Sequence, residues 1–84
     1  MAPTRSDGRL VDMVLTLQLD READGRWIAE VPTLPGVLAY GQTREQAIAS
    51  VKALALHVLA DRIESGEEDG AALDAVAFVA PAAA

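Results

Sequence analysis

One long amphipathic stretch constrains the fold more than any other feature of the sequence. Between Thr43 and Gly66, apolar residues recur with the i, i+3, i+4 and i+7 spacing of one helix face, at Ala47, Ile48, Val51, Leu54, Ala55, Val58 and Leu59. Thr43 followed by Gln46 is typical of a capping box at a helix start, and glycine is common just past a helix end. We therefore predict a helix over residues 44–65, whose apolar stripe has to be buried against another layer.

The rest of the chain predicts that this layer is a small sheet. Apolar and other residues alternate with period two over residues 13–19, which is typical of a strand with one buried face. The charged segment 20–26 contains a glycine and suits a hairpin loop. Further strands are predicted at 27–31, 37–40 and 74–80. The expected fold is α+β, with a three- to four-stranded antiparallel sheet packed on one helix in the order β-β-β-α-β.

The segment between the second and third predicted strands has the chemistry of a tight turn. Pro32 keeps the residue before it extended. Pro35 then fixes its own φ, and Gly36 supplies the positive φ that a type II turn requires. We assign an architectural role, and no catalytic one, to the motif residues Pro32, Leu34, Pro35, Gly36, Gly41 and Thr43.

Length and charge limit the possible functions. The 84 residues suffice for one domain, predicted at 13–80, with a flexible arm at 1–12 and a tail at 81–84. Seven basic and 13 acidic residues give a net charge of −6, which argues against direct nucleic-acid binding. The apolar run at 13–17 is too short for a signal peptide or a membrane span, so a cytoplasmic protein is expected.

The sequence offers few groups for metal or cofactor chemistry. It contains no cysteine and one histidine, which excludes thiolate and histidine-rich metal sites. The run from Asp20 to Gly25 resembles a calcium loop, but the twelfth position, where a bidentate glutamate belongs, is Val31. Catalytic metal pairs need carboxylates that converge from separate strands, whereas these acids share one turn. We predict a solvated hairpin, no metal and no cofactor.

No catalytic constellation is recognisable either. His57 lies four residues before Asp61, a spacing that predicts a hydrogen-bonded pair on the helix surface. Ser50 has no oxyanion glycine turn around it. No glycine-rich phosphate loop occurs. The expectation is a protein that is not an enzyme.

Four short motifs follow one another between residues 24 and 47: D-G-R-W at 24–27, P-T-L-P-G at 32–36, G-Q-T at 41–43 and R-E-Q-A at 44–47. In this combination and spacing the chain resembles the HicB antitoxin family and its single-domain relatives, over about residues 14–65. The resemblance implies a partial ribonuclease H-like fold that lacks the nuclease carboxylates. It also implies a partner, because members commonly neutralise a small basic RNA-cleaving toxin of the HicA type by covering its active site.

The chain departs from the family pattern near its end. Full-length antitoxins of this family carry a C-terminal DNA-binding module, whereas residues 67–84 are acidic or alanine-rich. Direct DNA binding is therefore not expected.

Two acidic groups and two aromatic residues are the candidate partner-binding residues: Asp20, Glu22, Asp24, Glu67, Glu68 and Asp69, with Trp27 and Tyr40 as apolar anchors. In the alternative interpretation the acids only aid solubility and Trp27 belongs to the core. The protein is then a toxin-free oligomeric scaffold or ligand-binding domain. Either interpretation includes a homo-oligomer, a dimer or larger, because a small sheet leaves open edges.

Overall fold

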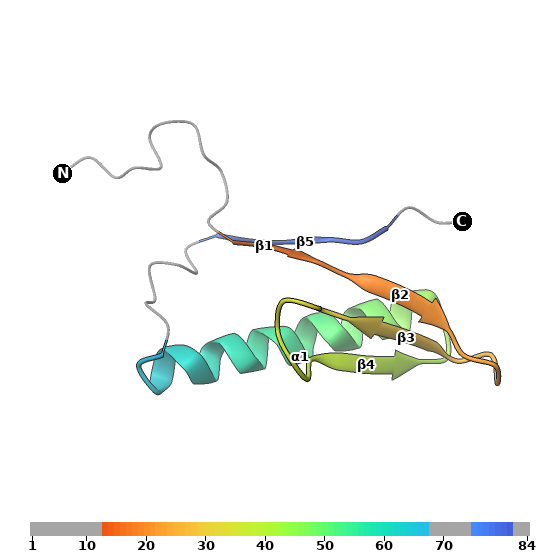
Figure 1. Cartoon of the computed structure of the whole chain (residues 1–84), viewed down its shortest axis with the longest axis horizontal. Helices are drawn as coiled ribbons and strands as arrows, with labels where there is room; N and C mark the ends of the chain where they lie inside the picture. The colour runs from red at the N-terminus through yellow and green to blue at the C-terminus, as the bar shows by residue number, and fades with distance from the viewer. Residues whose placement is uncertain (1–12, 68–74, 82–84) are drawn as a thin grey trace.

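A computed structural model describes residues 13–67 and 75–81, which form an α+β fold of strands packed on one long helix (Figure 1). The strands are β1 (Met13–Thr16), β2 (Gln18–Arg21), β3 (Trp27–Glu30), β4 (Leu38–Gly41) and β5 (Val76–Val79), and the helix is α1 (Arg44–Glu64). The predicted fold class is confirmed. The predicted arm at 1–12, tail residues 82–84, Glu68 and Asp69 lie outside the described residues.

The strands form two sheets, and the N-terminal segment contributes one strand to each of them. β2, β3 and β4 form an antiparallel sheet, with Leu19 opposite Ala29 and Ala29 opposite Ala39. β1 pairs in parallel with β5, with Leu15 opposite Phe78. β1 and β2 follow each other across Leu17, whose N–H donates to the carbonyl of Val79 at 2.8 Å. The single strand predicted at 13–19 is therefore interrupted where its partner changes from β5 to β3.

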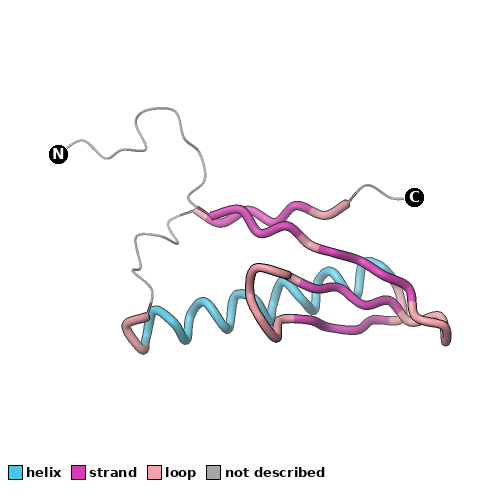
Figure 2. Tube along the Cα trace, viewed as in Figure 1, coloured by secondary structure: helices cyan, strands magenta, loops and turns pink. Residues whose placement is uncertain are grey.

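The parallel pairing of β5 follows from the course of the chain. The helix leaves the end of β4 and runs back along the strands before β5 begins beside β1 (Figure 2). A helical connection of this kind joins parallel strands. The three-stranded antiparallel sheet is thus as predicted, and the last strand adds a parallel pair to it.

The core lies between α1 and one face of the strands. The helix contributes an i, i+4 row, Ala47, Val51, Ala55 and Leu59, of which each member is almost completely buried. The strands and the following turn contribute Leu15, Leu17, Ala29, Val31, Leu34 and Val37. The burial of one such leucine or valine side chain stabilises the fold by about 1.5–3 kcal/mol.

The segment from Val31 to Val37 makes two successive turns. Leu34 N–H donates to the Val31 carbonyl at 2.9 Å, and Val37 N–H donates to the Leu34 carbonyl at 3.0 Å. Gly36, the third residue of the second turn, has φ +83°. The predicted type II turn is confirmed, and it returns the chain into β4.

The two ends of α1 carry the predicted caps. Thr43 Oγ1 accepts from the N–H of Gln46 at 3.1 Å, and Gln46 Oε1 accepts from the N–H of Gln42 at 2.9 Å. At the other end Gly66 has φ +85°, and its N–H donates to the Ile63 carbonyl at 3.1 Å. This is the left-handed glycine of a Schellman cap. The helix therefore begins and ends within one residue of the predicted bounds.

Candidate functional site

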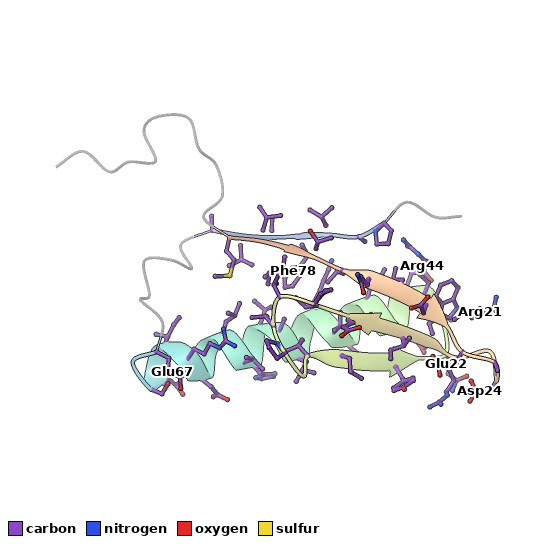
Figure 3. The ribbon with its side chains drawn as sticks, in the orientation of Figure 1. Arg21, Glu22, Asp24, Arg44, Glu67 and Phe78 are labelled. Carbon is purple, nitrogen blue, oxygen red and sulfur yellow. The ribbon has the colours of Figure 1, made fainter. Side chains whose placement is uncertain are left out.

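The two predicted acidic groups lie at opposite ends of the molecule. Glu22 and Asp24 lie on the hairpin between β2 and β3, whereas Glu67 follows the far end of α1 (Figure 3). The hairpin itself is nearly balanced in charge, since residues 20–26 contain three acidic and two basic side chains. A single acidic surface made of both groups is therefore not formed by the described residues.

Asp24 is held by its neighbour rather than free for a ligand. Arg26 donates to its carboxylate twice, from the backbone N–H at 3.1 Å and from Nε at 2.8 Å. The backbone hydrogen bond from Arg26 lowers the pKa of Asp24, desolvation opposes this effect, and the hydrogen bond and charge of the Arg26 side chain add to the lowering. This is an exposed Asx-type turn, and its carboxylate already has a cationic partner.

The two predicted aromatic anchors lie on opposite faces of the sheet. Trp27 is opposite Gly41 in the register, and Tyr40 is opposite Ile28 on the other face. Trp27 packs against the core, as the alternative interpretation expects, with the Arg21 guanidinium carbon 5.4 Å from its ring centre. Tyr40 is 43% exposed, and Arg26 lies 4.5 Å above its ring. Only Tyr40 is thus available to a partner.

The face of β2, β3 and β4 that points away from α1 carries a mixed apolar and acidic surface. Register places Asp20, Ile28 and Tyr40 in one row, and Glu30 beside Leu38 in the next. Tyr40 and Leu38 are exposed, the latter to 40%, and Ile28 is half-buried. Both carboxylates are exposed. We call this surface the outer patch, made of Asp20, Ile28, Glu30, Leu38 and Tyr40.

Three of these five residues, Ile28, Glu30 and Leu38, were not among the predicted site residues. The sequence signal is that apolar residues occupy both phases of the strand alternation in 27–31 and 37–40. A strand covered on one face normally alternates apolar with polar residues. Apolar residues in the second phase therefore indicate a surface that is available for contact.

The described residues offer little to a small ligand. Over 13–67 and 75–81 no pocket forms, and no group of three or more histidine or acidic side chains is placed to hold a metal ion. Ser50, His57 and Asp61 are all exposed on α1. The predicted His57–Asp61 hydrogen bond is not formed in this part of the chain.

In the part of the chain that the structure describes, no helix has the length and apolar character needed to cross a membrane. Comparison with known proteins gave no match to a family model, to a curated protein or to a solved structure. Function is therefore inferred from the residues and geometry described above.

Proposed function

We propose that this chain is a protein-binding module of the HicB antitoxin kind. In this proposal the outer patch binds a small basic toxin of the HicA type and covers its RNA-cleaving site. The observation that carries the proposal is the outer patch itself, in which exposed Tyr40 and Leu38 lie beside two exposed carboxylates. The resemblance of residues 24–47 to the family supplies the kind of partner.

The composition of the outer patch supports a protein partner. Tyrosine is enriched among the residues that dominate binding energy, because it buries a large rigid ring and keeps a polar end. Leu38 lies next to Tyr40 in the following row of the sheet, and half-buried Ile28 lies opposite Tyr40 on β3. This arrangement provides an apolar centre of the kind found in protein interfaces.

Charge supports a cationic partner rather than a nucleic acid. Asp20 and Glu30 flank the apolar centre, and the whole chain has a net charge of −6. Acidic groups at the rim of an interface accelerate association with a basic protein and repel phosphate. The nearby Arg26 is already engaged with Asp24 and Tyr40, so it adds little free positive charge.

The test is a titration of the full chain with any small basic protein that a neighbouring reading frame encodes, followed by calorimetry at low and at physiological salt. We expect Tyr40→Ala to weaken binding by at least about tenfold. Glu30→Lys should weaken binding and reduce the salt dependence of the affinity. Glu64→Lys, the same charge change at an exposed site on α1, is the matched control and should have no such effect. Absence of a complex at both salt concentrations would contradict the antitoxin assignment.

A toxin-free oligomeric scaffold of the same fold is the second candidate. The observation that favours it is the exposure of large apolar side chains away from the outer patch, Leu56 and Ile63 on α1. A contact between copies along α1 would cover both side chains.

A further inference from the structure

β4 forms an open edge of the antiparallel sheet, next to the outer patch. In the strand order β2-β3-β4, and within residues 13–67 and 75–81, it pairs with β3 alone (Figure 1). Its sequence, Leu-Ala-Tyr-Gly, contains no charged residue and no proline. Edge strands are commonly protected against further pairing by such residues. The β4 edge therefore has the features of a strand that can accept another strand.

The register of β3 and β4 shows which backbone groups point out of this edge. The Val31 N–H donates to the Val37 carbonyl at 3.0 Å, so these two residues form a hydrogen-bonded pair. Hydrogen-bonded and non-hydrogen-bonded pairs alternate along an antiparallel ladder. This alternation makes the pair at Ala39 hydrogen-bonded and the pairs at Leu38 and Tyr40 non-hydrogen-bonded. The N–H and C=O groups of Leu38 and Tyr40 therefore point away from β3.

The same two residues form the exposed apolar centre of the outer patch. A strand paired with β4 would bond to the backbone of Leu38 and Tyr40. Because side chains alternate between the two faces of a sheet, every second side chain of that strand would lie beside Leu38 and Tyr40 on the outer face. The β4 edge and the outer patch are thus one continuous surface, with backbone groups on one side and side chains on the other.

Charge indicates what kind of strand this surface accepts. Glu30 is exposed on the outer face of β3, two strand spacings or about 9–10 Å from the backbone of an added strand. A lysine or arginine on that strand can reach across the uncharged β4 to the Glu30 carboxylate. A second copy of this chain would instead bring a further net charge of −6 to the edge. Long-range electrostatics therefore favours a basic protein.

We infer that the basic partner binds by strand addition, with an extended segment of its chain paired to the edge of β4. This inference rests on the proposed function, which supplies the partner, and it adds the mode of binding. Main-chain hydrogen bonds to Leu38 and Tyr40 provide affinity that does not depend on the partner's sequence. A lysine or arginine at alternate positions of the partner segment provides selectivity through Glu30.

The test is amide hydrogen exchange of the full chain, free and with any small basic protein that a neighbouring reading frame encodes. In the free chain the amides of Leu38 and Tyr40 should exchange fast and the amide of Ala39 slowly, because only the Ala39 N–H points to β3. In the complex we expect exchange at Leu38 and Tyr40 to slow by at least about tenfold. Ala39 is the internal control.

Two substitutions at Leu38 separate the backbone from the side chain. Leu38→Ala and Leu38→Pro both remove the leucine side chain, but only proline also removes the N–H that points out of the edge. Proline is tolerated at such positions of an edge strand. We expect Leu38→Pro to weaken binding at least about tenfold more than Leu38→Ala. Circular dichroism and Trp27 fluorescence establish that each variant is folded, and the exchange experiment decides the question if Leu38→Pro is not.

The outcomes distinguish this inference from the proposed function. A complex in which both amides stay unprotected, or in which the two folded variants bind equally, leaves the proposed function standing and overturns strand addition. Absence of a complex contradicts both. Protection of Leu38 and Tyr40 in the free chain would mean that a second copy, or another part of this chain, already covers the edge, and it also overturns the inference.

Discussion

The substitution Gly41→Ala tests how closely the helix packs on the sheet. A Cβ atom at Gly41 would lie 2.4 Å from the backbone nitrogen of Ala47 and 2.9 Å from its Cα. Neither atom belongs to a movable side chain, so the first turns of α1 have to shift away from β4. Gly41 has an ordinary negative φ. The cost therefore comes from the contact and not from backbone strain.

The expected loss is that of an overpacked core. Insertion of one methyl group into a packed site costs about 1–3 kcal/mol, and the close approach to backbone atoms of Gln46 and Ala47 places Gly41→Ala in the upper part of that range, at about 2–3 kcal/mol. One kcal/mol corresponds to roughly 4–8 °C in Tm for a domain of this size, so we expect a decrease of about 8–24 °C. Thermal and urea unfolding followed by circular dichroism measure it.

Trp27 provides a local readout of the same substitution. It lies opposite Gly41 in the β3–β4 register, on the face that α1 covers. A shift of the helix should therefore change the fluorescence and near-ultraviolet circular dichroism of Trp27 in the folded variant. Unchanged stability together with an unchanged tryptophan signal would refute the close-packing argument.

Three further predictions concern local contacts. Gly36→Ala has open space for its methyl group but retains φ +83°, so it should cost about 1–2 kcal/mol in urea unfolding and leave the Trp27 signal unchanged. Thr43→Ala removes the helix cap and should cost about 1 kcal/mol by the same measurement, whereas an equal loss from Thr33→Ala in the preceding turn would argue against capping. For Asp24, folding lowers the pKa below its ordinary value of 3.8. Its stabilising contribution is thus present above pH 3.8 and lost as pH falls through the folded-state value, so the stability difference from Asp24→Asn should vanish in acid and persist at neutral pH.

Local signals made α1 and the turn at Gly36 predictable. The helix bounds depend on the periodic stripe and on caps at Thr43 and Gly66, each of which acts within a few residues. The type II turn depends on Pro35 and Gly36 alone. The break at Leu17 was not predictable in this way, because apolar alternation continues through it. It arises from the pairing of β1 with a strand that comes some sixty residues later in the chain.

The candidate site depends on strand register and sheet topology, neither of which can be read directly from the sequence. Trp27 and Tyr40 form a pair of anchors only if they share a face, and the register across the Pro32–Gly36 turn places them on opposite faces. Likewise, leucine is an ordinary residue in a strand, so the residue type of Leu38 does not show that it is exposed. Its exposure follows from the fact that α1 covers the other face, with no second layer over this one in the described part of the chain.

The central claim is that the outer patch is the surface that binds a basic protein. When the isotope-labelled chain is titrated with any small basic protein that a neighbouring reading frame encodes, its amide chemical shifts report the contacts residue by residue. We predict that the largest changes occur at Ile28, Glu30, Leu38 and Tyr40, and that Tyr40→Ala needs at least about tenfold more partner to produce the changes at the other three. Changes confined to β5 and Leu56, or no change at all, would contradict the claim.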